Sequence, residues 1–415
     1  MPGGPVSCLR PRDLRRGAVL TLVFLGVLGA GAAGGCWQEE DPFAREYVAG
    51  AAAAPGGEAA GLPGAAGGAD APDPAQAART ADRAAVARAA AQAAADGKSG
   101  RDAAEEVVGR SGDRWGVVYG RTEYEEFAQS LDGSYTGVGL RVAQASGAAI
   151  AVAQVRSGGP ADRAGIRAGD RLRTVDGRAV GGLPPAEVIA LLRGADRGAG
   201  PGSRVVLELE RAGRARTETL LRERLSTAPV TVRRLPGGIT LIKVTAFTRG
   251  SGAQVRAAVR SAPAGGGVML DLRGNPGGLI GEAVTAASAF LDGGLVATYD
   301  VRGAERALYA QRGGDTVRPL VALVDGGTMS AAELVTGALQ DRGRAVTVGT
   351  RTFGKGSVQM PTELPDGSVA ELTVGLYRTP AGRSPDGRGI APDLAVADRA
   401  EERARSVLSG LGAGS

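Results

Sequence analysis

The sequence predicts an α/β domain preceded by a smaller β-rich domain and a short helical region. Between residues 223 and 398, apolar runs of strand length alternate with segments of helical spacing, which is typical of a largely parallel sheet. Between residues 134 and 222, short apolar strands and turns enclose one helix, expected from Pro185 to Arg193. A chain of 415 residues is long enough for two or three domains.

The composition excludes several classes of active site. The chain has no His, and its two cysteines, Cys8 and Cys36, lie within the first 36 residues. A Ser-His-Asp triad, a His-ligated zinc site and a thiol nucleophile in the folded body are therefore excluded. The 49 basic residues are scattered among 44 acidic ones without a basic block, so nucleic-acid binding is not expected.

Residues 1–36 have the pattern of an export signal or membrane anchor. Four arginines precede Gly17 to Gly35, a run without any charged residue. This run is just long enough to span a bilayer with its basic flank in the cytoplasm, so we expect an anchored protein whose body lies outside. The alternatives are a cleaved signal and a lipoprotein signal processed at Cys36.

Residues 37–100 and 399–415 are expected to contribute little to the folded body, whereas residues 101–133 are expected to form helices. Residues 37–100 are rich in Ala, Gly and Pro and predict a low-complexity tether, although Thr80 to Ala95 has helical propensity. A helical region is expected over residues 101–133, where Thr122-x-x-Glu125 is a capping-box pattern. Residues 399–415 are expected to form a C-terminal tail.

The β-rich region, residues 134–222, resembles a PDZ domain. Its segment GPADRAGIRAGDRLRTVDGR, residues 159–178, matches that family closely. Gly137-Val138-Gly139-Leu140 stands where PDZ domains have the loop whose backbone N–H groups bind a peptide's terminal carboxylate; taken alone, this tetrapeptide is more typical of a simple turn. The resemblance implies protein partners that bind through their C-termini by adding a strand to a sheet edge.

Three loops that follow predicted strands carry the candidate chemistry of the α/β domain. The first, residues 271–278 (DLRGNPGG), has two glycines after Asn-Pro and predicts a nest of backbone N–H groups for an oxyanion, with a plain turn as the alternative. The second, residues 325–333 (DGGTMSAAE), places Ser330 at a strand-to-helix turn. There it is either an exposed nucleophile or the cap of a helix with Glu333.

The third loop, residues 352–359 (TFGKGSVQ), contains Lys355, one of only three lysines among the 49 basic residues. An amine can lose its proton and act as a general base, whereas a guanidinium cannot. The alternative is a solvated surface lysine. Gln359 lies four residues further on, where its side chain is able to orient the amine without adding charge.

A serine, a lysine 25 residues later and the lack of His together point to Ser-Lys nucleophilic catalysis. The segments DLRGNPGG, GTMSAAELVTGALQD, TFGKGSVQ and GIAPD, behind a PDZ-like region, resemble the C-terminal processing peptidases, also called tail-specific proteases. The resemblance covers about Tyr119 to Val396. The chain departs from that family at residues 130–134, where Ser-Leu-Asp-Gly-Ser replaces the usual Asp-Pro-x-Ser element.

This resemblance implies a crotonase-like α/β core and a serine endopeptidase that cuts near protein C-termini without a metal or cofactor. Carried over by motif, Ser330 is the nucleophile, Lys355 the general base and Gln359 the residue that orients Lys355. The implied oxyanion hole uses the backbone N–H groups of Gly277 and Ala331. An alternative from another functional class is an inactive PDZ-containing scaffold at the cell envelope.

Overall fold

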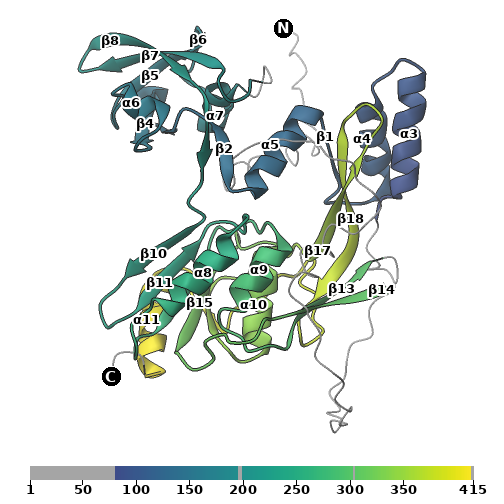
Figure 1. Ribbon diagram of the computed structural model, residues 1–415, viewed down its shortest axis with the longest axis vertical. Helices are drawn as coiled ribbons and strands as arrows, with labels where there is room; N and C mark the ends of the chain where they lie inside the picture. The colour runs from purple at the N-terminus through teal and green to yellow at the C-terminus, as the bar shows by residue number, and fades with distance from the viewer. Residues whose placement is uncertain (1–79, 195–198, 302–303, 413–415) are drawn as a thin grey trace, which may run out of the picture.

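The computed structural model describes residues 80–194, 199–301 and 304–412, and Figure 1 shows their arrangement. An α/β core occupies the lower half of the view, the predicted PDZ domain lies at the upper left, and a pair of helices lies at the upper right. A long hairpin of β17 (Ser357–Glu363) and β18 (Val369–Arg378) rises from the core toward those helices (Figure 1). The predicted order of a helical region, a β-rich domain and an α/β core is therefore confirmed.

The core is built on a six-stranded sheet in the order β10-β11-β12-β15-β16-β19. Its strands are β10 (Val230–Arg234), β11 (Thr240–Val244), β12 (Val268–Asp271), β15 (Leu320–Val324), β16 (Val346–Gly349) and β19 (Leu394–Ala395). All neighbouring pairs are parallel except β10 with β11. Every residue of β12 and β15 is buried, which explains why both strands are apolar apart from Asp271 at the end of β12, since a parallel sheet is covered on both faces.

Helices cover both faces of this sheet. They are α8 (Ser251–Arg260), α9 (Ile280–Ala287) and α10 (Ala331–Asp341) on one face, and α11 (Ala400–Gly410) on the other. Because side chains alternate along a strand, Leu270 packs with the first three helices, whereas Met269 packs with Leu408 of α11. The prediction that residues 399–415 form a tail is therefore wrong for α11, whose apolar stripe covers the sheet.

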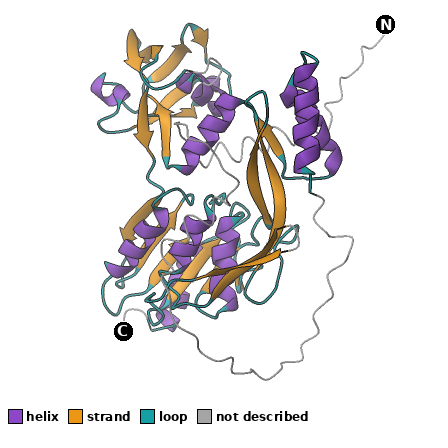
Figure 2. Cartoon of the chain, turned by 45° about the vertical axis from the view of Figure 1, so that its right-hand side comes forward, coloured by secondary structure: helices purple, strands orange, loops and turns teal. Residues whose placement is uncertain are grey.

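A second sheet joins the core to the N-terminal region. It has the strand order β1-β18-β13-β14, with β17 paired to β18. The additional strands are β1 (Val117–Tyr119), β13 (Leu295–Val301) and β14 (Ala304–Tyr309). Because β1 pairs antiparallel with β18, the segment just before β1 is held beside the start of the β17–β18 hairpin. Figure 2 shows this hairpin as the long pair of strands that runs from the core toward the paired helices.

The N-terminal helical region is larger than the sequence predicts. It contains α3 (Arg83–Ala95), α4 (Gly100–Ser111) and α5 (Arg121–Leu131). Helix α3 buries Val86 and Ala90 in a cluster with α4 and β18, so the prediction of a tether over residues 37–100 is wrong for α3. The predicted capping box at Thr122 is also wrong, because α5 begins earlier and the Glu123 carboxylate accepts the Gly120 N–H at 2.8 Å.

The predicted PDZ domain is a sheet of order β3-β4-β5-β7-β8 with one main helix beside it. Its elements are β3 (Leu140–Gln144), β4 (Ile150–Val155), α6 (Pro160–Arg163), β5 (Arg171–Val175), β6 (Arg178–Ala179), α7 (Pro185–Arg193), β7 (Arg204–Arg211) and β8 (Arg214–Leu221). A ribbon of β2 (Ser134–Gly137) and β9 (Glu223–Ser226) joins this domain to its neighbours. Strand β3 is at the edge of the sheet and contacts α7.

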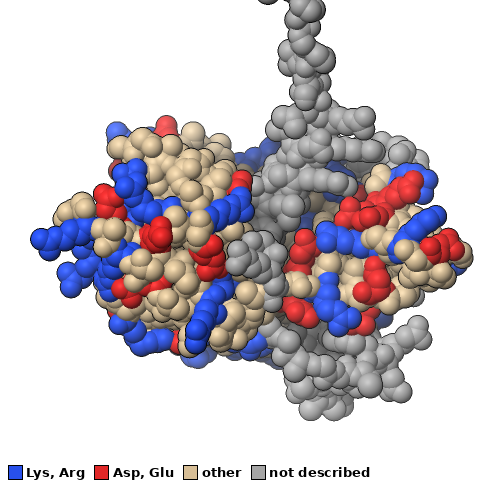
Figure 3. Space-filling view, turned by 90° about the horizontal axis from the view of Figure 1, so that it is seen from above, with Lys and Arg blue, Asp and Glu red and all other residues tan. Residues whose placement is uncertain are grey.

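The sequence predicts a signal or anchor at the N-terminus and a surface without a basic block. The predicted signal or anchor, residues 1–36, lies outside the described residues, and among those that are described no helix is long and apolar enough to cross a membrane. On the face shown in Figure 3, basic and acidic side chains are interspersed on both visible parts of the molecule.

Candidate active site

The three predicted loops meet at one edge of the core sheet. Strands β12, β15 and β16 are parallel neighbours, so the loops that follow them emerge side by side. Two backbone hydrogen bonds join them: the Met329 N–H donates to the Asn275 carbonyl at 2.9 Å, and the Phe353 N–H donates to the Thr328 carbonyl at 3.0 Å. The fold thus brings the candidate serine, lysine and oxyanion loops together.

Ser330 precedes α10 in a strained backbone conformation, with φ of 50° and ψ of −119°. It stands in a capping-box position, but its hydroxyl accepts no capping hydrogen bond, and the Glu333 N–H donates instead to the Ser330 carbonyl at 2.8 Å. The hydroxyl is therefore not consumed by helix capping. A serine at this position faces the positive end of the helix dipole, which favours developing negative charge nearby.

Glu333 is a fully buried carboxylate that ties the serine loop to the lysine loop. It accepts four hydrogen bonds, from Ser330 N at 2.9 Å, Lys355 N at 2.8 Å, Gly354 N at 2.8 Å and Thr352 Oγ1 at 2.5 Å. Burial raises the pKa of Glu333 above its ordinary value, although these four donors oppose the shift. The sequence signal for Glu333 was its position three residues after Ser330, which predicted a capping contact only.

Lys355 is half-buried, and its amine lies against an aromatic ring. Its Nζ is 5.3 Å from the ring centroid of Trp115, and no hydrogen bond joins this amine to the Ser330 hydroxyl in the part of the chain that the structure describes. Burial lowers the pKa of Lys355 from its ordinary value. Three carboxylates oppose that shift: Glu371, Asp113 and Glu333. Burial therefore favours the neutral amine, while the three carboxylates favour the ammonium.

No hydrogen bond joins Gln359 to Lys355 among the described residues, so the predicted orienting contact stays a prediction. Gln359 lies on β17, and its Nε2 donates to the backbone carbonyl of Trp115. Trp115 therefore contacts both side chains that were predicted to work together. Sequence reasoning missed Trp115 because it lies 240 residues before Lys355 and belongs to no motif.

The oxyanion loop agrees only partly with the prediction. A Cβ on Gly277 (φ +99°) would lie 3.0 Å from the Ala331 nitrogen, so glycine permits the close packing of this loop on the start of α10. The Gly277 N–H donates to Asn275 Oδ1 at 2.8 Å, which corrects the expectation that it is available to a substrate in this conformation. The Ala331 N–H has no hydrogen-bond partner among the described residues.

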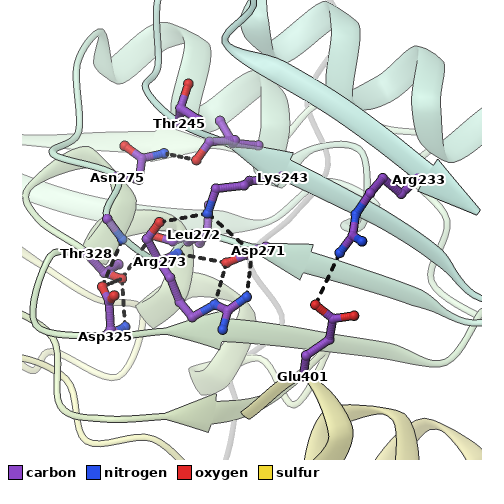
Figure 4. A network of polar contacts seen from close by, with 12 residues as sticks. Arg233, Lys243, Thr245, Asp271, Leu272, Arg273, Asn275, Asp325, Thr328 and Glu401 are labelled. Atoms are coloured by element: carbon purple, nitrogen blue, oxygen red, sulfur yellow. Dashed lines mark hydrogen bonds and ion pairs between the residues drawn. The ribbon is translucent and has the colours of Figure 1, made fainter. Parts of the chain in front are cut away.

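A polar network fixes the base of the same loops (Figure 4). Asp271 is buried and accepts two hydrogen bonds from the Arg273 guanidinium at 2.8 Å, while Lys243 Nζ lies 3.3 Å away. Burial alone would raise the pKa of Asp271, but Arg273 and Lys243 outweigh it and lower that pKa. Asp325 Oδ1 accepts the backbone N–H of Gly274 at 2.9 Å and so joins the first two loops.

The residues predicted to bind a peptide carboxylate form the connection between β2 and β3. Gly139 has φ of 78°, and the Val138 carbonyl accepts the Ala161 N–H at 3.0 Å, which holds the turn against α6. Gly137 ends β2, and Leu140 begins the edge strand β3. The four residues therefore lie at one end of the sheet edge that contacts α7.

Comparisons with known proteins follow the same division of the chain. Residues 238–396 match the model of peptidase family S41, and residues 151–211 match that of the PDZ domain. The carboxy-terminal processing protease CtpA of Bacillus subtilis is 32% identical over 287 residues, which are 68% of this chain and 60% of that protein. The chloroplastic C-terminal processing peptidase of Tetradesmus obliquus is 38% identical over 286 residues, which are 63% of this chain and 60% of that protein.

A solved structure titled photosystem II D1 C-terminal processing protease is 30% identical, with 75% of this chain and 86% of that chain covered and a TM-score of 0.46. The chain spans about three fifths of the length of the curated relatives named above. The matches to the family models agree with the predicted core and with the domain before it. The chain belongs to peptidase family S41, with its peptidase segment at residues 238–396 and a PDZ domain before it.

Proposed function

We propose that this chain is a serine endopeptidase in which Ser330 is the nucleophile and Lys355 the general base. The observation that carries the proposal is the state of Ser330, which immediately precedes α10 and whose hydroxyl accepts no capping hydrogen bond. The Lys355 backbone is held beside it through Glu333, and burial lowers the pKa of the Lys355 amine. Membership of a peptidase family supports the same reaction class.

In the proposed reaction, the Ser330 oxygen attacks the scissile carbonyl while its proton passes to the neutral Lys355 amine. The Ala331 N–H and the N-terminus of α10 stabilise the negative charge on the carbonyl oxygen. The Lys355 ammonium then protonates the departing amine, and water hydrolyses the acyl-enzyme. Since the amine lies over Trp115, it must turn toward Ser330 before it accepts the proton. The Gly277 N–H adds a second donor to the oxyanion only when it leaves Asn275 Oδ1.

We further propose that the substrates are proteins bound through their C-termini. The edge position of β3 next to α7 supports addition of a peptide strand there, with its carboxylate at residues 137–140. A peptide with an amidated C-terminus should then be cleaved more slowly than the free acid. Equal cleavage of the two peptides would contradict this role of the PDZ domain.

The proposed location is the cell envelope, with the body outside the cytoplasm. The uncharged run from Gly17 to Gly35 behind four arginines supports an anchor, a lipoprotein signal or a cleaved signal. Fractionation of cells that express the whole chain should leave the protein with the membranes. Soluble mature protein that starts after residue 36 would indicate signal cleavage instead.

Labelling with a fluorophosphonate tests the proposed nucleophile directly. The probe should attach to the whole chain at Ser330, as located by mass spectrometry of the digest, and the Ser330→Ala variant should not be labelled. Peptide cleavage by that variant should fall by at least about a thousandfold. If the wild-type chain folds but is neither labelled nor able to cleave the peptide, the alternative of an inactive PDZ-containing scaffold is favoured.

A further inference from the structure

Trp115 contacts the lysine loop from a distant part of the chain. It lies in the segment between α4 and β1, and its ring centroid is 5.3 Å from Lys355 Nζ and 5.7 Å from the ring centroid of Phe353. Its backbone carbonyl accepts the Gln359 amide. A distance below about 6 Å from an ammonium to a Trp ring is the range of a cation–π interaction.

The Trp115 segment is held firmly on the core. The buried Asp113 carboxylate accepts the N–H groups of Trp115 at 3.1 Å and Gly116 at 2.8 Å. The same carboxylate accepts the Thr373 N–H at 2.9 Å and its hydroxyl at 2.7 Å, which fixes the segment to β18. These hydrogen bonds fix the backbone of Trp115 relative to β18 and so determine where its ring lies.

We propose that Trp115 is a positioning residue that holds the Lys355 amine, as an ammonium, in a resting arrangement away from Ser330. This inference rests on the proposed function, since it assigns Lys355 as the base. The ring face attracts the protonated amine and not the neutral one, so the contact favours the form that cannot accept a proton. Loss of the proton releases the amine to turn toward Ser330.

Several charged groups near the amine bear on this equilibrium, and Asp386, which accepts the Gly356 N–H and pairs with Arg114, is one of them. The others are Glu371 on β18, Asp113 before β1, Glu333 on α10, and the Arg114 guanidinium, whose Cζ is 4.7 Å from the centroid of the same ring. Those three carboxylates favour the ammonium, whereas burial disfavours it. Glu333 and Asp113 are held by hydrogen bonds that do not involve the ring, and Arg114 also pairs with Asp386 at 3.3 Å, so replacing the ring with another apolar side chain tests the ring's contribution.

The test measures the Lys355 pKa without relying on activity. The chain has only three lysines, so lysine labelled with ¹³C at Cε gives three resonances in the full chain, and Lys355→Arg identifies the one that belongs to Lys355. Trp115→Leu keeps an apolar side chain, although a smaller one, and removes the ring face, whereas Trp115→Phe keeps a ring. We expect the Leu variant to lower the Lys355 pKa by about one unit and the Phe variant to shift it less.

The acid limb of the fluorophosphonate labelling rate should move to lower pH by the same amount in the Leu variant. Phe127→Leu is the matched control, because it removes a ring that stacks on Tyr119 and not on the lysine. It should leave the Lys355 titration unchanged. Equal Lys355 pKa values in the wild type and both Trp115 variants, or equal shifts in the Leu and Phe variants, would overturn the proposal.

A measurement on the unchanged chain does not depend on how the variants fold. The Trp115 ring current should move the Lys355 ε-protons upfield of those of Lys98, which is exposed. Matching shifts at the two lysines would overturn the proposal. A chain that is not labelled at Ser330 but shows this upfield shift and the Trp115-dependent pKa would contradict the proposed function and leave the contact between Trp115 and Lys355 established.

Discussion

The backbone N–H groups of Ser330 and Lys355 donate to the same atom, Oε2 of Glu333, at 2.9 and 2.8 Å. The other carboxylate oxygen accepts the Thr352 hydroxyl and the Gly354 N–H. One buried side chain therefore fixes the relative position of two loops that follow different strands. A change that weakens it should affect the site and the stability together.

Glu333→Gln should lower the fluorophosphonate labelling rate at least about tenfold and cost about 3 kcal/mol in the free energy of unfolding. In a Gln side chain, one of the two carboxylate oxygens is replaced by an NH₂ group, which cannot accept a hydrogen bond. The two donors that bind that oxygen in the wild type therefore lose their acceptor. Labelling kinetics and urea unfolding measure the two effects.

Glu282→Gln is the control for this prediction, because its carboxylate accepts the N–H groups of Gly250 and Gly252 at the start of α8, at 2.7 Å each. It should lose stability and keep its labelling rate. Labelling of Glu333→Gln at the wild-type rate would contradict the role assigned to Glu333.

Ser330→Gly should be more stable than Ser330→Ala by about 1 kcal/mol, although neither should be labelled. A φ of 50° with a ψ of −119° is strained for any residue with a Cβ and is open to glycine. The relief of strain outweighs the extra chain entropy of glycine in the unfolded state. Urea unfolding of the two variants gives the difference, and a less stable Gly variant would show that this backbone carries no strain.

Much of the core could be predicted because its strands and helices have simple patterns. The helix predicted from Pro185 to Arg193 is α7, with the same bounds. The candidate loops were predictable as neighbours, since they follow apolar parallel strands. Local periodicity and strand order were sufficient for these elements.

The contacts made by site residues could not be predicted in this way. Gln359 shares a loop with Lys355 in the sequence, yet its amide binds the carbonyl of Trp115, which only the pairing of β1 with β18 brings near. The helical propensity of Thr80 to Ala95 was visible in the sequence, but the packing of α3 was not, because its buried face is mostly Ala and its partners in α4 and β18 lie elsewhere in the chain. Long-range packing decided both cases.

The stability of the chain should fall as the pH rises from about 4.5 to 7, through the titration of Glu371. Burial on β18 raises the pKa of this carboxyl to about 7, while the Lys355 charge opposes the rise. In this window the folded state keeps a proton that the unfolded state has lost, so the stabilisation present below pH 4.5 disappears toward pH 7.

The Glu371→Gln variant lacks this titration, so its stability relative to the wild type should increase across the window by about 2 kcal/mol. Urea unfolding at several pH values measures the difference, with the exposed Glu106→Gln as control for the lost charge. A constant difference between the Glu371 variant and the wild type would contradict the raised pKa.

Arg222→Lys should destabilise the PDZ domain by about 3 kcal/mol and weaken peptide binding. The Arg222 side chain is buried and donates to the carbonyls of Leu191 and Leu192 at 3.1 and 2.8 Å, near the end of α7, and to the Arg204 carbonyl at 2.8 Å. A lysine ammonium lacks the planar fork that serves these acceptors together. Because α7 borders the proposed peptide site, its loosened end should also lower the affinity for a peptide with a free C-terminus.

Arg224→Lys is the matched control for this change, since Arg224 is exposed and lies two residues away. It should unfold at the same urea concentration as the wild type and bind the peptide equally well. Binding is measured by fluorescence anisotropy of a labelled peptide with the full chain, and unfolding by circular dichroism. If Arg222→Lys matches Arg224→Lys in both measurements, the buried guanidinium does not hold α7 in place, and the apolar packing of α7 on the domain core supports the peptide site instead.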